Sequence, residues 1–353
     1  MRKQRENGSP RVAFAGGSSG GHLMPGVAVA EALRALVPGS RPMFLTTGRK
    51  VERHCGEAIA EFESVSVPAT PWTGAGGKLL FPARCVLAMG RIRRLLGEFR
   101  PHAAVGLGGC NSIIPVLAAR LSGVPTLLLE GNAVPGRAVR VLGPVADCVA
   151  VQWQEAARHL CARRIVVSGN PVRRHLFGGD RSAARRRLGL EEHRLTLLAM
   201  GGSQGALSLN GILQEALTEL RADLQVLHLT GVDHLHAALR SPANERPSYR
   251  PIGFLPRIGE AYAAADFVLA RSGASTLAEL TALGLPSILV PYPWASAREQ
   301  HANANILRRA GAAVVLDQSR LTAERLRRAI EALAADPDRL GRMSEAASRV
   351  GRP

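Results

Sequence analysis

Two glycine-rich segments contain the residues best suited to chemistry, AGGSSGGH at 15–22 and MGGSQGA at 200–206. Each follows a short apolar run and precedes a helical pattern, so its backbone N–H groups could hold a phosphate at the start of a helix. Glycines at such a turn can also serve close packing alone, and for either segment by itself the two interpretations are equally good. Two such segments at matching places in two halves of the chain favour phosphate binding.

The common nucleotide motifs do not fit the first segment. A dinucleotide fingerprint requires glycine where Ser18 or Ser19 stands, and a Walker loop requires lysine where His22 follows Gly21. The spacing therefore supports neither a nicotinamide enzyme nor a P-loop ATPase. His22 could accept a proton from an attacking hydroxyl, or it could only bond nearby backbone at the start of a helix, and the residues alone leave both open.

A third polar segment, 253–305, contains a tight turn at 271–274. Ser275 or Thr276 is expected to cap the following helix, in which Glu279 lies one turn from the start. The Glu279 carboxylate could only complement the helix dipole. Alternatively, it could accept both hydroxyls of a ribose while N–H groups of the turn hold a diphosphate.

Short apolar runs alternate with helical patterns along the chain, which predicts parallel sheets covered by helices on both faces. The pattern restarts near residue 195, after an arginine-rich linker at 169–189. We therefore expect an α/β fold of two similar doubly wound domains facing each other. The expected strands are 12–15, 43–46, 65–67, 103–107, 126–129, 148–151, 165–167, 195–200, 224–229, 267–270, 288–290 and 314–316. The expected helices include 25–36, 113–121, 207–220, 274–283, 300–310 and 322–334.

We place the two domains at 1–170 and 171–338, followed by a C-terminal helix at 339–353 that could pack back on the first domain. The chain has 353 residues, 46% of them hydrophobic and 21% charged, which excludes a disordered, collagen-like or coiled-coil protein. No run reaches the roughly 18 apolar residues of a membrane-spanning helix, and the N-terminal residues do not resemble a signal peptide. We therefore expect a cytosolic chain.

The five cysteines are odd in number and scattered, which argues against a disulfide framework or a zinc site. Cys110, in a glycine-rich turn, is better explained as an incidental thiol than as a nucleophile.

The formal net charge of +17 makes nucleic-acid binding a hypothesis to weigh. The arginines, however, are spread in short clusters at 91–94, 185–187 and 325–328, which we expect on solvated helix faces. Aromatic residues, at 4%, offer few platforms for stacking bases. The stretch 78–96 mixes arginines with apolar residues, and it is either a core helix with a solvated face or a segment that docks on an anionic membrane.

Several ordered motifs resemble those of the MurG family, which are UDP-N-acetylglucosamine–N-acetylmuramyl-(pentapeptide) pyrophosphoryl-undecaprenol N-acetylglucosamine transferases of peptidoglycan synthesis. The resemblance covers nearly the whole chain. The matching segments are AGGSSGGHLMPGVAVAEAL, VGLGGCNSIIPVLAARLSGVPTLLLEGNAVPG, GNPVR, GGSQGA and RSGASTLAEL.

This resemblance implies the GT-B glycosyltransferase architecture, in which two Rossmann-like domains lie on either side of a cleft, with no metal and no cofactor. The first domain would face the acceptor and the membrane, and the second would bind the UDP sugar. The implied reaction moves N-acetylglucosamine from UDP-N-acetylglucosamine to the C4 hydroxyl of the muramyl sugar of lipid I, with inversion, and gives lipid II and UDP.

The implied partners are UDP-N-acetylglucosamine, lipid I and the anionic inner-leaflet membrane surface, and not nucleic acid. The implied location is the cytoplasmic face of the cell membrane, as a peripheral protein that serves cell-wall biogenesis, cell shape and cell division.

Individual residues take roles from the same resemblance. His22 or Glu130 would be the base that receives the acceptor's proton, with His22 favoured, while Glu279 would bind the ribose and backbone groups of Leu255 the uracil. The other residues implied in substrate binding are Ser19, Gly20, Gly21, Asn132, Arg173, Ser203, Ala274, Ser275, Thr276, Leu277, Ala278 and Gln300.

The chain departs from the family pattern at Ser18, Gly131, Cys110 and Asn111. These departures concern the acceptor side more than the donor side.

Two alternatives stay open. One is another UDP-sugar enzyme of the same architecture, either a natural-product glycosyltransferase or a UDP-N-acetylglucosamine 2-epimerase, which the order of the motifs disfavours. The other is a catalytically dead or purely nucleic-acid-binding basic protein, and the intact set of Arg173, Glu279 and Gln300 argues against the loss of activity.

Overall fold

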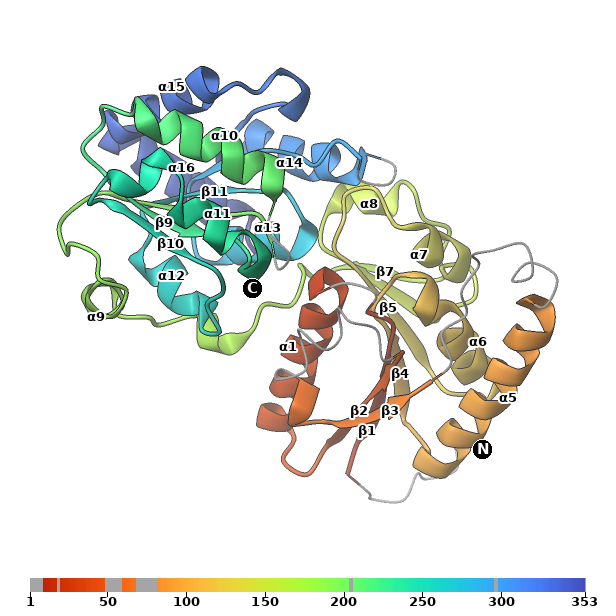
Figure 1. Cartoon of the computed structure of the whole chain (residues 1–353). Helices are drawn as coiled ribbons and strands as arrows, with labels where there is room; N and C mark the ends of the chain where they lie inside the picture. The colour runs from red at the N-terminus through yellow and green to blue at the C-terminus, as the bar shows by residue number, and fades with distance from the viewer. Residues whose placement is uncertain are drawn as a thin grey trace. The chain divides into compact units, whose positions relative to one another are not determined.

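The computed structural model describes residues 9–17, 20–47, 59–67, 81–202, 206–294 and 298–352 (Figure 1). The chain divides into two compact units, Met1–Arg173 and Arg174–Pro353. Each unit has its own parallel sheet and its own hydrophobic core. The prediction of an α/β fold with two doubly wound domains is confirmed.

The first unit is built on a seven-stranded sheet in the order β3-β2-β1-β4-β5-β6-β7, with all neighbouring strands parallel. Its strands are β1 (Arg11–Ala15), β2 (Arg41–Thr46), β3 (Glu63–Ser66), β4 (Ala103–Gly106), β5 (Thr126–Glu130), β6 (Cys148–Val151) and β7 (Ile165–Val167). Its helices are α1 (Gly20–Leu36), α5 (Phe81–Phe99), α6 (Ile113–Leu121), α7 (Arg137–Leu142) and α8 (Gln154–Ala157), with a 3₁₀ turn at Cys110–Ser112.

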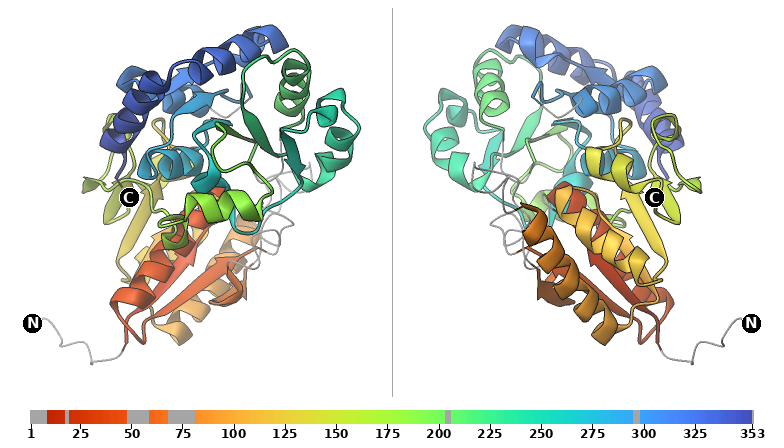
Figure 2. Two further views of the ribbon diagram at one scale, coloured as in Figure 1. Left: turned by 90° about the vertical axis from the view of Figure 1, so that its left-hand side faces the viewer. Right: turned by 90° about the vertical axis from the view of Figure 1, so that its right-hand side faces the viewer.

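Neighbouring residues of the central strands belong to opposite faces of this sheet, as the period of two along a strand requires. Phe14 and Phe44 pack in the core beneath α1, and their rings stack 4.9 Å apart. Ala13 and Met43 belong instead to the core beneath α5 and α6. Figure 2 shows the two layers, with α1 before the sheet in one view and α5 and α6 before it in the opposite view.

The second unit repeats this plan with six parallel strands in the order β10-β9-β8-β11-β12-β13. The strands are β8 (Thr196–Met200), β9 (Gln225–Leu229), β10 (Tyr249–Ile252), β11 (Phe267–Ala270), β12 (Ser287–Leu289) and β13 (Ala313–Val315). The helices are α9 (Arg181–Arg187), α10 (Leu207–Thr218), α11 (Leu235–Leu239), α12 (Ile258–Ala264), α13 (Ala274–Ala282), α14 (Glu299–Ala310), α15 (Ala323–Ala334) and α16 (Pro337–Val350).

The C-terminal helix α16 packs within the second unit, against α13, α14 and α15. Its buried face consists of Leu340, Met343, Ala346 and Ala347, which follow one another at helical spacing. The structure therefore places this helix within the second unit. Among the described residues, no helix combines the length and the apolar character needed to cross a bilayer.

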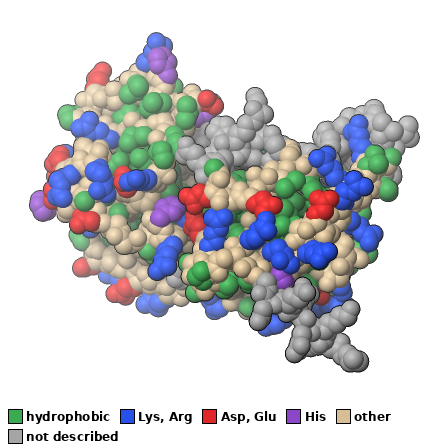
Figure 3. Space-filling model, turned by 90° about the horizontal axis from the view of Figure 1, so that it is seen from below, with side chains coloured by type: hydrophobic (Ala, Val, Ile, Leu, Met, Phe, Trp, Pro, Cys, Tyr) green, Lys and Arg blue, Asp and Glu red, His purple; other side chains and the backbone are tan. Residues whose placement is uncertain are grey.

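Charged side chains are mixed over the surface, and Figure 3 shows Lys and Arg spread among acidic and hydrophobic side chains on one face. The expectation of solvated arginine clusters holds for Arg91, Arg93 and Arg94 of α5, which are exposed. It is wrong for Arg185, whose exposed fraction is 3%. The expected linker at 169–189 is likewise only partly irregular, because it contains α9.

An ion pair fastens α9 to the sheet of the second unit. Arg185 Nη2 donates to Asp266 Oδ2 at 2.7 Å, and its Nε donates to the Ala264 carbonyl oxygen at 3.0 Å. Asp266 also accepts from the backbone N–H of Thr196, at 2.6 Å, and pairs with Arg181. The arginine-rich helix is thus held by a buried charge that the composition alone could not distinguish from its solvated neighbours.

Replacing Arg185 should destabilise the second unit strongly. In Arg185→Met the half-buried Asp266 carboxylate loses its buried partner, and we expect a loss of about 3 kcal/mol in the free energy of unfolding, measured by urea denaturation. The matched control is Arg186→Met on the same helix, whose exposed pair with Glu192 should matter little. Equal effects of the two substitutions would contradict this account.

Candidate functional site

Each sheet has a point where the strand order reverses direction, between β1 and β4 in the first unit and between β8 and β11 in the second. Open parallel sheets bind their ligands at this point, beyond the carboxyl ends of the strands. The four glycine-containing segments of interest follow these strands, with described residues at 16–17, 107–109, 201–202 and 271–273. The fold therefore brings the predicted phosphate-binding segments to the expected edge of each sheet.

In the first unit, two of these loops touch backbone to backbone. A Cβ atom on Gly16 would lie 2.6 Å from the carbonyl oxygen of Gly108, and the φ angle of Gly16 is +112°. Only glycine is compatible with both conditions. Helix α1 starts at Gly20, five residues before the expected start at Pro25, so Gly20, Gly21 and His22 belong to its first turn. Ser18 and Ser19 lie outside the described residues.

His22 lies against the second loop of the same unit. Its ring is half-buried, and a Cβ atom on Gly108 would lie 3.1 Å from His22 Cδ2. Burial lowers the pKa of His22 below its ordinary value of 6.5. The imidazole is therefore neutral at pH 7, the form in which it can accept a proton.

Glu130, at the end of β5, is 6% exposed and organises the loop that follows it. Its Oε1 accepts from the backbone N–H of Asn132 at 2.9 Å and from Asn132 Nδ2 at 3.0 Å, and its Oε2 accepts from the N–H of Gly136 at 2.8 Å. Burial raises the pKa of Glu130, and these hydrogen bonds oppose the rise. The structure thus joins two of the expected site residues, Glu130 and Asn132, by direct contact.

The remaining expected residues of the first unit lie around the same edge. Cys110 is an exposed free thiol in the 3₁₀ turn after the second loop, and the side chain of Asn111 lies 3.5 Å from Thr47 Oγ1. Arg173 ends the first unit and lies near Glu31 of α1; burial raises the pKa of Glu31, and the charge of Arg173 opposes that rise.

In the second unit, α13 begins without a side-chain cap. Its N-cap is Gly273, so the expectation that Ser275 or Thr276 caps the helix is wrong: both lie inside its first turn. Leu277 and Ala278 are buried at 0% and 3% exposed, and the N–H of Leu277 donates to the Gly273 carbonyl at 3.0 Å. Those two residues anchor the helix, and residues 274–276 of the first turn are half-buried.

The turn that precedes α13 is held from several sides. Arg271, 8% exposed, donates to the Val290 carbonyl at 3.1 Å and to Ser208 Oγ at 3.2 Å, and its guanidinium lies 5.6 Å from the centre of the Tyr292 ring. Buried Ser272 donates through Oγ to the carbonyl of Gln300 at 2.8 Å.

Helix α14 supports the same turn. Asn303 Nδ2 donates to the Ser272 carbonyl at 3.2 Å, and Gln300 Oε1 accepts from the N–H of Tyr292 at 2.9 Å. Gln300 therefore lies beside the turn that precedes α13. Ser203, in the loop after β8, lies outside the described residues.

Glu279 lies one turn into α13, half-buried. The hydroxyl of Tyr262, on α12, donates to its Oε2 at 2.6 Å. Leu255 lies in the loop between β10 and α12, near the start of the helix that carries this tyrosine. Sequence reasoning singled out Glu279 but missed Tyr262, because no local pattern marks a contact between two helices 17 residues apart.

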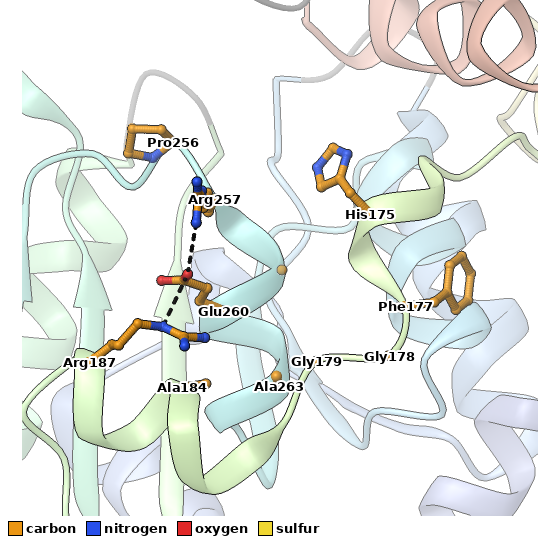
Figure 4. A pocket seen from close by; sticks show the side chains of 11 residues that line it. His175, Phe177, Gly178, Gly179, Ala184, Arg187, Pro256, Arg257, Glu260 and Ala263 are labelled. Atoms are coloured by element: carbon orange, nitrogen blue, oxygen red, sulfur yellow. Dashed lines mark ion pairs between the residues drawn. The ribbon is translucent and has the colours of Figure 1, made fainter. Parts of the chain in front are cut away.

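A pocket of about 520 Å³ lies beside this region of the second unit (Figure 4). Figure 4 shows Glu260 of α12 between Arg187 and Arg257, with ion-pair distances of 3.3 and 3.9 Å. A Cβ atom on Gly179, which also lines the pocket, would lie 2.7 Å from Ala263 Cβ. Glycine there lets the segment before α9 approach α12 closely.

Comparison with known protein families identifies one family whose two domain models match this chain. The model of the glycosyltransferase family 28 N-terminal domain matches residues 12–151, and that of its C-terminal domain matches residues 196–352. The first match spans β1 to β6 of the first sheet, and the second spans all six strands of the second sheet.

Relatives and a solved structure resemble the chain over nearly its whole length. A UDP-N-acetylglucosamine–N-acetylmuramyl-(pentapeptide) pyrophosphoryl-undecaprenol N-acetylglucosamine transferase from Desulforudis audaxviator is 38% identical, with 97% of this chain and 95% of that protein aligned. The transferase of the same name from Sorangium cellulosum is 40% identical, with 96% and 84% aligned. The crystal structure of Acinetobacter baumannii MurG is 28% identical with a TM-score of 0.76, covering 98% of this chain and 96% of that one.

Proposed function

Because this chain belongs to the MurG family within glycosyltransferase family 28, we propose that it performs the reaction for which its relatives are named. It transfers N-acetylglucosamine from UDP-N-acetylglucosamine to lipid I and gives lipid II and UDP for peptidoglycan synthesis. Through that product we propose a contribution to cell shape and cell division.

The observation that carries this proposal is the start of α13. A helix N-terminus bears a partial positive charge and N–H groups without helical partners, and Gly273 supplies no side-chain acceptor for them. An anionic diphosphate is suited to that place. Glu279 lies one turn farther, where a carboxylate can accept the hydroxyls of a ribose. The N–H groups at the start of α13 and the Glu279 carboxylate together are suited to bind the diphosphate and the ribose of a nucleoside diphosphate.

The other donor contacts are proposed from the resemblance to the family. Leu255, before α12, would offer backbone groups to the uracil, and Gln300, beside α13, would contact the sugar. For Ser203, Ser19, Gly20, Gly21, Arg173 and Asn132, contacts with the donor are proposed from the resemblance to the family alone. Charge that develops on the departing UDP would be stabilised by N–H groups of the turn at 271–273 and by the N-terminus of α13.

Substitution of Glu279 tests the donor site together with the reaction. We expect wild-type protein to release UDP from UDP-N-acetylglucosamine only when a lipid I analogue is present. In Glu279→Ala, kcat/KM for the donor should fall at least about tenfold, because hydrogen bonds to a charged group contribute about 1.5–3 kcal/mol each. The matched control is Glu215→Ala, an exposed position on α10 that should leave the rate unchanged.

Other outcomes of that assay would point elsewhere. Formation of free sugar or of an epimer without an acceptor would favour a different UDP-sugar enzyme. Absence of UDP binding would refute the donor site altogether.

On the acceptor side we propose that His22 is the base. The C4 oxygen of the muramyl sugar would bond to the anomeric carbon as the bond to UDP breaks on the opposite side, and the hydroxyl proton would pass to the imidazole. Glu130 accepts three N–H groups from its own loop, which supports a role in holding Asn132 rather than in proton transfer.

The pH profile tests the role of His22. A base must be neutral, and the pKa of His22 lies below 6.5, so kcat/KM should be at its plateau at pH 7 and fall only as pH drops through that lower value. His22→Gln should lower kcat by roughly 10²–10⁴-fold and remove this acid limb. The control is His159→Gln, an exposed histidine of the same unit. An unchanged acid limb in His22→Gln would exclude His22 as the base.

We propose further that α5 docks the protein on an anionic inner-leaflet surface, as a peripheral protein on the cytoplasmic face of the membrane. Its Ala88, Ile92 and Leu96 are in the core, which fits a core helix, but Val86 and Leu87 are 71% and 74% exposed. Exposed arginines, at 84, 91, 93 and 94, lie along the same helix. Lys78 to Leu80 lie outside the described residues.

Vesicle sedimentation tests the docking of α5. Wild-type protein should bind vesicles containing anionic phospholipid at low salt, and Leu87→Asp should weaken binding roughly tenfold, because inserting a leucine contributes about 1.5–3 kcal/mol. Leu239→Asp, at an exposed leucine of α11, is the control. Equal binding by wild type and Leu87→Asp would rule the docking proposal out.

A further inference from the structure

We propose that Tyr262 is a positioning residue for Glu279, and that through it the donor site selects ribose over 2′-deoxyribose. This inference rests on the proposed function, in which Glu279 binds the ribose of a uridine nucleotide. It goes beyond that function by naming the group that sets the orientation of the carboxylate.

The geometry places the two side chains in direct contact. Tyr262 lies on α12, is 3% exposed, and its hydroxyl lies 2.6 Å from Glu279 Oε2 on α13. An O–H···O⁻ bond of that length is typical of a neutral hydroxyl that donates to a charged carboxylate. The same hydroxyl lies 3.7 Å from Met200 Sδ, at the carboxyl end of β8. The tyrosine hydroxyl therefore contacts both Glu279 and the carboxyl end of β8, a strand that flanks the point where the strand order of the sheet reverses.

A glutamate needs such a partner if it is to recognise a diol. The last torsion of a glutamate side chain is broad, so the plane of the carboxylate is not fixed by the rotamer. Two vicinal hydroxyls, by contrast, have a set separation and direction, and both can donate to one carboxylate only in a restricted range of that torsion. A hydrogen bond from a buried tyrosine to Oε2 restricts the torsion before the ligand arrives.

The consequence concerns the 2′-hydroxyl in particular. A ribose offers two donors to the fixed carboxylate, whereas 2′-deoxyribose offers one. A carboxylate whose plane is free to rotate can still accept a well-aligned hydrogen bond from a single hydroxyl. It is rarely oriented to accept hydrogen bonds from two adjacent hydroxyls at once. Loss of the tyrosine hydroxyl should therefore weaken the binding of UDP more than the binding of 2′-deoxy-UDP.

The test compares the dissociation constants of UDP and 2′-deoxy-UDP by calorimetry. In wild type we expect UDP to bind roughly tenfold or more tightly, the effect of one hydrogen bond to a charged group. In Tyr262→Phe, which keeps the ring and removes the hydroxyl, we expect this ratio to fall about three- to tenfold. With substrate, KM for the donor should rise while kcat at saturating donor stays close to wild type.

Tyr249→Phe is the matched control. Tyr249 is also 3% exposed and belongs to the same unit, but its hydroxyl lies 2.7 Å from His228 Nδ1 and not beside Glu279. Removal of either hydroxyl disturbs a buried hydrogen bond, so thermal unfolding should report comparable changes. Only the Tyr262 variant should change the preference for ribose.

The outcomes separate this inference from the proposed function. A lowered ratio in Tyr262→Phe with an unchanged ratio in Tyr249→Phe supports it. An unchanged ratio in both variants, or the same drop in both, overturns it and leaves the glycosyltransferase assignment intact. Wild-type protein that binds UDP and 2′-deoxy-UDP equally overturns the ribose role of Glu279 as well, and wild-type protein that binds neither overturns the proposed function itself.

Discussion

The parallel strand order constrains everything else in the two units. In a parallel sheet all carboxyl ends lie on one edge, and helices must return the chain across one face or the other. Where the order reverses, between β1 and β4 or between β8 and β11, the loops on either side leave toward opposite faces and expose the edge between them. The glycine loops follow these four strands. In the first unit two of those loops approach so closely that a side chain at Gly16 would clash with the Gly108 carbonyl.

Charge at this edge comes largely from the backbone. Helix α13 starts at a glycine N-cap, and α1 starts within the glycine segment itself, so neither start has an acidic residue in its first turn. Acidic caps would neutralise the partial positive charge of these helix ends. Because the described first turns of α1 and α13 contain no acidic residue, their partial positive charge remains available to an anionic ligand. The isolated helices are less stable without such a residue. The acidic group that is present, Glu279, lies one turn farther in.

The central strands could be predicted because their apolar runs are continuous and their bounding glycines are local signals. Strand β10 could not, since Pro251 lies within it; proline is tolerated there because β10 is an edge strand, a fact that depends on tertiary order. The start of α1 was placed too late because proline is usual in a first turn, whereas Pro25 lies inside this helix.

Long-range contacts explain the other differences. Arg185 resembles Arg186 and Arg187 in sequence, and only its approach to Asp266, 81 residues away, makes it a buried residue. The motifs located Glu279 and Gln300, but Tyr262 was missed for the same reason as Arg185. Local patterns therefore indicated the groups that we propose to meet a ligand, whereas the groups that hold those residues in place emerged only from the folded chain.

The anchoring of the turn at 271–273 has a consequence for the entropy of association. Arg271 and Ser272 are already bound to Val290, Ser208 and Gln300, contributed by three neighbouring segments. A loop that is ordered only by its ligand loses conformational freedom at every binding event, and this loss subtracts from affinity. Here the loss occurs once, when the second unit folds. If the turn holds the donor as proposed, it can release product without having to disorder and receive the next nucleotide without having to reform.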